Sequence, residues 1–179
     1  MILLAFDPSL TRTGFALMKA PPVSVASIES GSFASEDPDA FIAQALALVE
    51  KFKPDFVAAE EARKIIMLYG KKQLWAGDVV VTPNAKQLKL SEIQGGLKGL
   101  TSAKRIPLVL VPPKTWRKAI LGNGNLPRDS AKAAALTYCA RLKIAVANHD
   151  EAEAACIGIW TSSCDAFRMH VYRERKVPA

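Results

Sequence analysis

Two carboxylates stand three residues apart at the start of an apolar segment, in "HDEAEAACIGIW". At about 100° per residue, Asp150 and Glu153 lie on one face of a helix, and this face is the one that carries the apolar side chains. Two like charges on a buried face are costly unless a cation lies between them. The spacing therefore favours a divalent metal ion bound by this pair.

A simpler explanation covers part of the same segment. Asn148 can cap the helix, and Glu151 at its third position can complete a capping box. Asp150 and Glu151 also stand where the helix dipole favours acids. This explanation leaves Glu153 unaccounted for, and it stays open beside the metal site. His149 is interpreted as a loop residue rather than as a ligand.

Two further acids each end an apolar, β-prone segment: Asp7 follows "ILLAF" and Glu60 follows "FVAA". One acid at the end of a strand is weak support for a site, but acids delivered by three separate elements are stronger support. Carboxylate oxygens without a histidine partner suit Mg²⁺ or Mn²⁺ better than zinc. Asp7, on a rigid strand, is expected to bridge two such ions.

The charge of the chain is distributed unevenly. The net charge is +7, yet residues 1–60 carry four basic and eight acidic side chains, whereas residues 61–140 carry fourteen basic and four acidic ones. A basic block is typical of proteins that bind a polyanion, most often nucleic acid, although a lysine-rich solvated surface gives the same count. Hard metal ions beside such a block indicate phosphodiester hydrolysis.

The elements that must position these acids follow from periodicity. Strand patterns over 1–6, 14–20 and 23–33 precede a helix from Asp37, a strand ending at Glu60, a helix over 91–104 and a strand over 106–111; helices follow to the end, the last one over 148–167. This order predicts an α/β fold with a five-stranded mixed sheet flanked by helices. We expect one domain over 1–179, with a basic excursion at about 62–90.

No apolar run approaches the ~20 residues that a membrane span needs, and the N-terminal apolar run lacks the features of a signal peptide. The sequence therefore predicts a cytoplasmic protein without a membrane partner.

Four motifs in order along the chain resemble those of RuvC-type Holliday junction resolvases, which have a ribonuclease H-like fold. The first is a strand–Asp-Pro–turn–Gly–strand opening, "AFDPSLTRTGFAL", and the second is a central strand ending in glutamate, "PDFVAAEEA". The third is a Gly-x-Gly loop followed by a basic residue, "LGNGNLPRDSAK", and the fourth is a terminal helix with two acids, "HDEAEAACIGIW".

The resemblance implies that four acids bind Mg²⁺, with Mn²⁺ able to substitute, and catalyse the cleavage: Asp7, Glu60, Asp150 and Glu153. It prefers Glu60 to Glu61 because of its register after "PDFVAA". It also implies a homodimer that makes paired nicks in a four-way DNA junction, leaving 5′-phosphate and 3′-hydroxyl ends, without a nucleotide cofactor. Basic residues around the Gly-x-Gly loop are implied DNA contacts; the candidates are Arg117 or Lys118 before it and Arg128 or Lys132 after it.

The chain departs from the family pattern in three ways. Ser9 replaces a glycine that is common after Asp-Pro, Glu153 replaces an aspartate, and the segment after Glu60 is longer than in the bacterial enzymes. Side chains of this segment could form a DNA-contacting insertion; they are Lys71, Lys72, Trp75, Lys86 and Lys89. A broader, phage-type nuclease for branched DNA or flaps is therefore an alternative.

Two other classes of protein fit the sequence less well than a resolvase does. A sugar-kinase-like ATPase opens with a similar Asp-turn-Gly motif, but it needs duplicated domains for which 179 residues leave no room. A DNA-binding module that has lost catalysis is disfavoured because all four acids are present.

The predicted helix over 91–104 carries apolar side chains that would suit contact with a second subunit; these are Ile93, Leu97 and Leu100.

Overall fold

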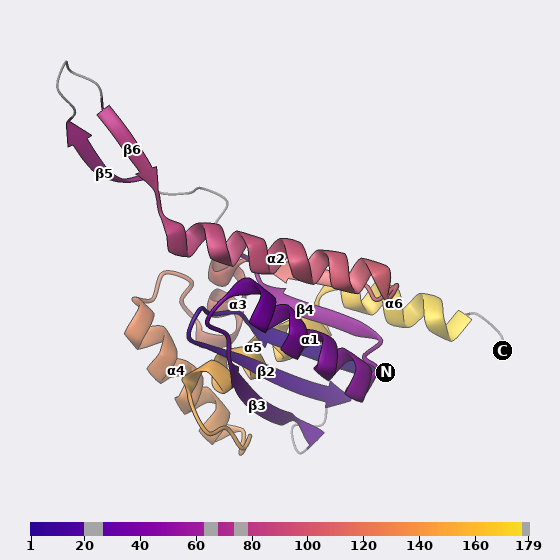
Figure 1. Ribbon diagram of the computed structural model, residues 1–179. Helices are drawn as coiled ribbons and strands as arrows, with labels where there is room; N and C mark the ends of the chain where they lie inside the picture. Colours follow the sequence, from indigo (N-terminus) through magenta and orange to yellow (C-terminus); the bar gives the residue numbers. More distant parts are fainter. Residues whose placement is uncertain (20–26, 63–67, 74–78, 177–179) are drawn as a thin grey trace.

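A computed structural model describes residues 1–19, 27–62, 68–73 and 79–176 of the protein. In these residues a five-stranded sheet and six α-helices form the body of the molecule (Figure 1). The strands are β1 (Ile2–Asp7), β2 (Arg12–Lys19), β3 (Glu29–Ala34), β4 (Phe56–Glu60), β5 (Leu68–Gln73), β6 (Val79–Pro83) and β7 (Leu108–Val111). The helices are α1 (Pro38–Phe52), α2 (Ala85–Ala103), α3 (Pro113–Leu121), α4 (Arg128–Arg141), α5 (His149–Ser163) and α6 (Asp165–Lys176).

The main sheet has the strand order β3-β2-β1-β4-β7. The β1–β2 and β2–β3 pairs join consecutive strands and are antiparallel, whereas β1–β4 and β4–β7 are parallel. Along the chain, α1 lies between β3 and β4, and α2 lies between β6 and β7. The predicted mixed sheet of five strands flanked by helices is therefore confirmed.

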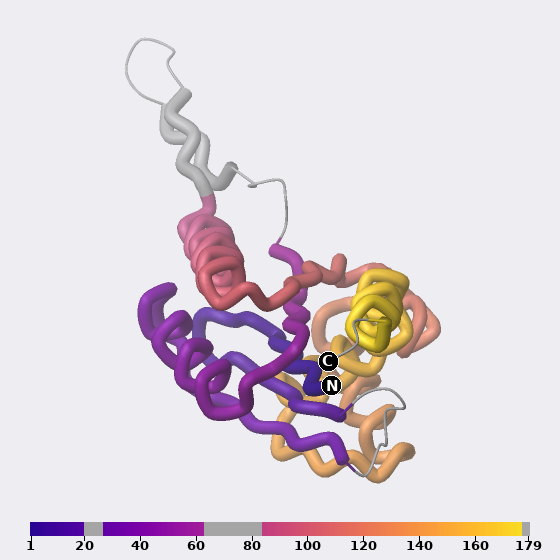
Figure 2. The backbone as a smooth tube through the Cα atoms, turned by 90° about the vertical axis from the view of Figure 1, so that its right-hand side faces the viewer, coloured from indigo at the N-terminus to yellow at the C-terminus, as the bar shows by residue number. Residues whose placement is uncertain are grey.

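Each face of the sheet is covered by its own helices (Figure 2). On one side α1 and α2 enclose a core that includes Leu4, Phe6 and Phe41. On the other side α3, α4, α5 and α6 enclose a second core, which includes Leu3, Ala5 and Trp116. The buried runs of β1 and β4 are continuous because helices cover both faces of these central strands.

The predicted bounds of two helices were wrong, and β3 begins at Glu29 although the strand predicted there includes residues 27 and 28. The expected last helix over 148–167 is in fact two helices, because Cys164 is extended at φ −75° and ψ 155° and the chain turns there. The turn lets Phe167 of α6 pack edge-on against Phe56, with ring centroids 5.2 Å apart. Helix α2 also starts earlier than expected, at Ala85, with Asn84 as its N-cap.

The excursion at 62–90 contains more regular structure than its sequence predicts. Strands β5 and β6 form a separate antiparallel hairpin, which extends from the N-terminal end of α2 (Figure 1). Lys71 and Lys72 belong to β5, and Lys86 and Lys89 are exposed on α2. Trp75 lies outside the described residues, as do positions 23–26 of the third predicted strand.

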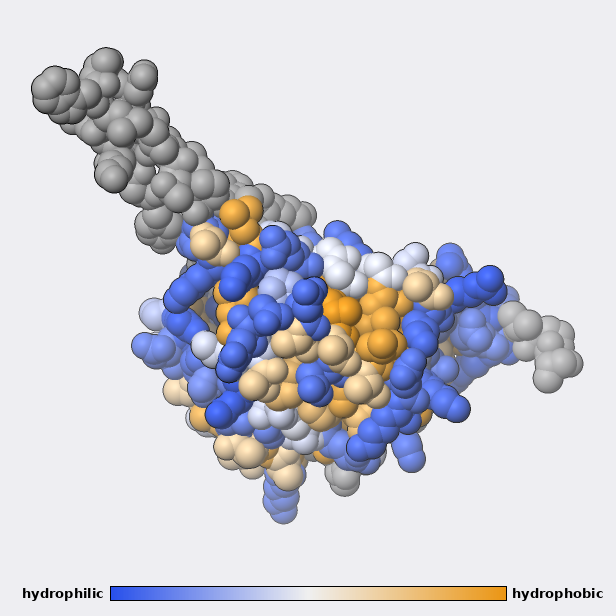
Figure 3. Space-filling model, viewed as in Figure 1, coloured by the Kyte–Doolittle hydropathy of each residue, from blue (hydrophilic) through white to orange (hydrophobic). Residues whose placement is uncertain are grey.

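The apolar face of α2 does not serve the contact first suggested for it. Ile93 and Leu97 are 0 % and 1 % exposed, because they belong to the core beneath α1 and α2. Gly96 allows this close packing, since a Cβ there would lie 2.7 Å from Ile42 Cδ1. A second subunit therefore cannot bind through Ile93 and Leu97. On the side of the molecule that Figure 1 also shows, hydrophobic surface remains visible between hydrophilic side chains (Figure 3).

Candidate metal centre

Side chains alternate between the two faces of β1 and β4, and this alternation brings Asp7 and Glu60 to the same edge and the same face of the sheet. Leu3 and Ala5 face the α5 side of the sheet, so Asp7, two residues further on, continues their row. Phe56 and Ala58 do the same on β4, and Glu60 ends that row. The parallel register pairs Leu3 with Phe56 and Ala5 with Ala58, so the next step brings Asp7 beside Glu60.

Helix α5 lies directly over this edge of the sheet because small residues let it approach. Gly14 is the ladder partner of Asp7, and a Cβ on it would lie 2.0 Å from the carbonyl oxygen of Asp150. Further along α5, a Cβ on Gly158 would meet Met18 at 2.2 Å. The first turn of α5 is fixed by Asn148, whose Oδ1 accepts the backbone N–H groups of Asp150 and Glu151. The predicted N-cap is thus confirmed.

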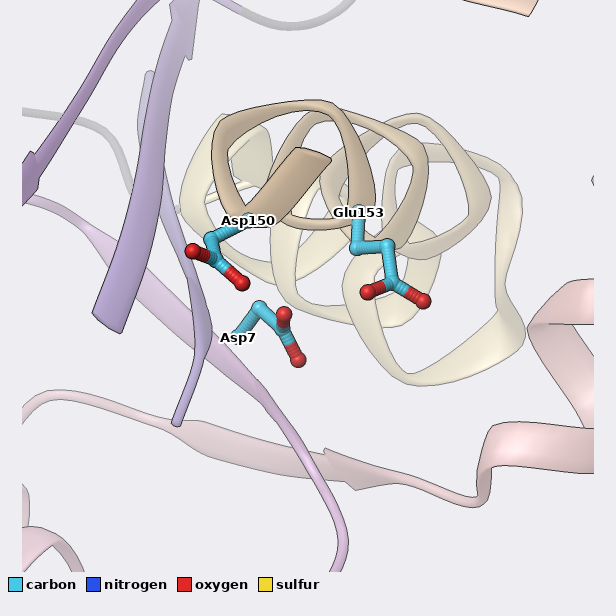
Figure 4. A group of neighbouring side chains, drawn as sticks. All are labelled: Asp7, Asp150 and Glu153. Atoms are coloured by element: carbon cyan, nitrogen blue, oxygen red, sulfur yellow. The ribbon is translucent and has the colours of Figure 1, made fainter. Parts of the chain in front are cut away.

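Three of the four predicted acids form one cluster. Asp150 and Glu153 point from α5 toward Asp7 at the end of β1 (Figure 4), and one carboxylate oxygen of each lies within 4.8 Å of the others. All three residues are buried, at 8 %, 4 % and 8 % exposure for Asp7, Glu153 and Asp150. A buried group of oxygen donors fits a hard divalent ion such as Mg²⁺ or Mn²⁺, so this cluster could hold one.

Glu60 stands beside the cluster and is held there by α3. The indole Nε1–H of the fully buried Trp116 donates to Glu60 Oε2 at 2.8 Å. The Nη2 of Arg117 lies 3.6 Å from the same oxygen and 3.4 Å from Glu153 Oε1. Arg117 therefore links the acid at the end of β4 to the acid on α5. Glu61, the alternative to Glu60, follows it and so lies off the row of side chains that faces α5.

The electrostatics of the cluster favour added positive charge. Burial, followed by the charges of Glu60 and Glu153, raises the pKa of Asp7 well above its usual value. Burial and the charge of Glu60 also raise the pKa of Glu153 to about 7. Arg117 opposes both shifts without cancelling them. The protein alone thus leaves the negative charge of these carboxylates incompletely compensated.

Glu151, between the two site acids, has a different role. It is 5 % exposed and accepts hydrogen bonds from Ser30 Oγ and Ser32 Oγ, each at 3.0 Å. It also accepts from the Ala147 N–H at 2.8 Å and from Asn148 Nδ2 at 3.0 Å. Glu151 therefore ties the N-terminus of α5 to β3, on the side away from the cluster.

The four basic candidates divide into two that lie near the acids and two that lie on the surface. Arg117 contacts Glu60 and Glu153, while Lys132 Nζ lies 2.5 Å from His149 Nε2. That histidine nitrogen is 3.1 Å from Asp150 Oδ1, so Lys132 reaches the cluster through His149. Lys118 and Arg128 are exposed.

Three residues of this centre were missed or undervalued in the sequence. Trp116 was not predicted as a site residue, because nothing in its spacing shows that its N–H reaches Glu60. His149 was interpreted as a loop residue, but it is the first residue of α5 and contacts Asp150. Only for Gly14 does the sequence itself indicate the contact, because a glycine inside a strand often marks the close approach of another backbone.

Comparison with solved structures identifies the fold. RuvC of Thermus thermophilus matches with a TM-score of 0.58 and 15 % identity over 98 % of this chain and 97 % of that one. The same protein in complex with a Holliday junction substrate also gives 0.58 and 15 %, over 97 % and 96 % of the two chains. The Fowlpox virus resolvase in complex with Holliday junction DNA gives 0.54 and 13 %, over 90 % and 97 %. The chain thus has the RuvC-type, ribonuclease H-like fold that its motifs predict.

Sequence comparison alone finds no matching family model and no matching curated protein. No helix among the described residues is both long and apolar enough to cross a membrane.

Proposed function

We propose that this protein is a metal-dependent endonuclease that resolves four-way DNA junctions. The observation that carries the proposal is the convergence of Asp7, Asp150 and Glu153 on one buried point of a RuvC-type fold, with Glu60 beside them. Two neighbours of the same fold are described as complexes with Holliday junction DNA, which supports a branched DNA substrate.

The carboxylates would hold two Mg²⁺ ions, with Mn²⁺ able to replace them. When bound, such ions activate water and stabilise charge on the phosphate and the leaving oxygen. Asp7, Glu60, Asp150 and Glu153 would hold these ions, with Asp7 as the carboxylate that both ions would share. Two neighbouring residues keep the acids in position: Trp116 donates a hydrogen bond to Glu60, and Asn148 caps α5, which carries Asp150 and Glu153.

DNA would be bound through its phosphates by the basic block of residues 61–140. Arg117, which contacts Glu153, and Lys132, which contacts His149, would bind the phosphate that is cut. The exposed Lys118 and Arg128 would contact phosphates further along the backbone. Binding by phosphate neutralisation makes the affinity fall steeply with salt concentration, and the junction would be recognised by its shape.

Symmetric resolution requires two cuts, and the described part of each chain supplies one such cluster of acids. We therefore propose that the protein acts as a homodimer, which leaves a 5′-phosphate and a 3′-hydroxyl at each nick. Light scattering on the purified protein, alone and with a junction, measures the number of subunits directly.

The test of this function is cleavage of a synthetic four-way junction in Mg²⁺, beside a flap and a linear duplex of the same sequence. We expect the wild type to cut the junction in preference to both. The Asp7→Asn variant should bind the junction in a gel-shift assay but cleave it at least about 10³-fold more slowly, because it loses the carboxylate that both ions would share in the proposed site.

An exposed aspartate provides the matched control, since Asp39→Asn removes the same charge from the surface of α1. It should cleave at the wild-type rate. Full activity of Asp7→Asn would refute the proposed site, and equal cleavage of flap and junction would favour the broader branched-DNA nuclease.

A further inference from the structure

The contacts that hold Arg117 among the acids are long for charged groups. Its Nη2 lies 3.4 Å from Glu153 Oε1 and 3.6 Å from Glu60 Oε2. Charge-assisted N–H···O bonds are usually about 2.7–2.9 Å long, and arginine commonly binds a carboxylate through two of them. The guanidinium thus lies between two carboxylates without forming a tight pair with either.

A second observation shows that this position does not satisfy the side chain. The Nε of Arg117 is buried and has no hydrogen-bond partner among the described residues. A buried N–H without an acceptor is unfavourable, because water would have bonded to it. The side chain as a whole is 19 % exposed and lies over the ring of Trp116, 5.3 Å from its centroid. A turn toward solvent would break this contact with the ring of Trp116 and would bring the unpaired Nε–H within reach of water.

The third observation concerns charge. Among the described residues, Arg117 brings one positive charge into contact with Glu60 and Glu153, while Lys132 contacts His149 and adds a weaker electrostatic effect on Glu153. A divalent ion carries twice the charge of a guanidinium and approaches carboxylate oxygens more closely, at about 2.0–2.1 Å for Mg²⁺. In competition for Glu153 and Glu60, the ion is therefore the stronger partner.

We propose that Arg117 is a placeholder cation, which holds the acids together in the metal-free protein and is displaced from Glu153 when a divalent ion binds. This inference rests on the metal site of the proposed function and assigns Arg117 a further role within it. Once displaced, the guanidinium becomes available to a backbone phosphate at the same edge of the sheet. Metal loading and DNA binding are then coupled through one side chain.

The direct test observes Arg117 in the wild-type protein. A ¹⁵N NMR titration with Mg²⁺ follows the Nε–H signal of Arg117, assigned by its disappearance in Arg117→Lys. We expect this signal to shift with the same half-saturation as Mg²⁺ binding measured by calorimetry. A signal that stays unchanged at saturating Mg²⁺ would show that the guanidinium does not move, and would overturn the inference.

Variants supply a second, independent readout. Arg117→Gln should lower the melting temperature of the metal-free protein and bind Mn²⁺ roughly three- to tenfold more tightly, because the ion no longer competes with an ion pair of this strength. Lys114→Gln is the matched control, since it removes a positive charge from an exposed side chain of the same helix. Its Mn²⁺ affinity should stay within about twofold of the wild type, because solvent screens an exposed charge.

The possible failures are distinguishable. If the wild type binds neither Mg²⁺ nor Mn²⁺, the proposed function fails and this inference fails with it. If the wild type binds metal but Arg117→Gln binds it no more tightly than Lys114→Gln does, Arg117 is not a placeholder and the metal site itself stands.

Discussion

Gly14 of β2 touches the backbone of α5 at Asp150, so closely that a Cβ on this glycine would lie 2.0 Å from the Asp150 carbonyl oxygen and 2.8 Å from the Glu151 nitrogen. Both atoms that it would meet are backbone atoms, which cannot rotate away as a flexible side chain does. The absence of a side chain at position 14 therefore sets how far the acids of α5 lie from Asp7, the ladder partner of Gly14.

The Gly14→Ala variant is predicted to push the N-terminus of α5 away from the sheet. We expect a loss of about 1–3 kcal/mol of unfolding free energy, as for overpacking elsewhere. We also expect Mg²⁺ affinity to fall at least several-fold, because Asp150 moves relative to Asp7. Gly99→Ala is the control, since a Cβ there meets nothing within 4 Å and the exchange favours the helix. Wild-type metal affinity in Gly14→Ala would contradict the prediction.

The stability of the metal-free protein should fall as the pH rises from about 5 to 8. The pKa of Glu153 is about 7 in the folded protein, against an ordinary value of 4.5, and the pKa of Asp7 is raised as well. In this window the folded state binds more protons than the unfolded state, so the free energy of unfolding decreases with increasing pH. Urea unfolding in EDTA at several pH values measures the slope.

Two comparisons test the origin of this slope. Glu153→Gln cannot ionise and should flatten the dependence between pH 5 and 8. Mg²⁺ should stabilise the wild type more at pH 8 than at pH 5, since it binds the ionised carboxylates. A wild type that becomes more stable over this range in EDTA would show that the acids are not held together as described.

Replacing Glu151 by glutamine should affect stability more than metal binding. Glutamine keeps one oxygen, so the donors Ser30, Ser32, Ala147 and Asn148 cannot all be satisfied. The expected cost is about 1–3 kcal/mol of unfolding free energy. Calorimetry should show a smaller loss of Mn²⁺ affinity than for Asp150→Asn. The exposed Glu29→Gln on β3 should be neutral in both measurements, and a larger metal defect in Glu151→Gln than in Asp150→Asn would place Glu151 in the site.

Trp116→Phe keeps a buried aromatic ring but removes the five-membered ring of the indole, including the N–H that donates to Glu60. Outer partners of metal-binding groups commonly contribute 10–100-fold to affinity or activity. We expect a loss of about tenfold in junction cleavage with little change in junction binding. Trp160→Phe, at a half-buried position further along α5, is the control and should cleave normally. Equal rates for the two variants would show that Trp116 does not position Glu60.

Much of this architecture was predictable from local patterns. A period of two along β1 places Asp7 in the row of Leu3 and Ala5, and a period of 3.6 places Asp150 and Glu153 on one face of α5. Both periods follow from backbone geometry, so the sequence alone determined which acids face the core. The order of strands and helices, and hence the mixed sheet, followed in the same way.

The contacts between distant elements were decided only by the tertiary structure. Periodicity marks a face of α2 as apolar but does not say what covers it, and Ile93 and Leu97 proved to pack under α1 rather than against a second subunit. It could not show that Trp116 and Arg117 reach Glu60, because that contact joins residues more than fifty positions apart. Such pairings depend on register, helix placement and side-chain reach together, and these are fixed only when all the elements pack at once.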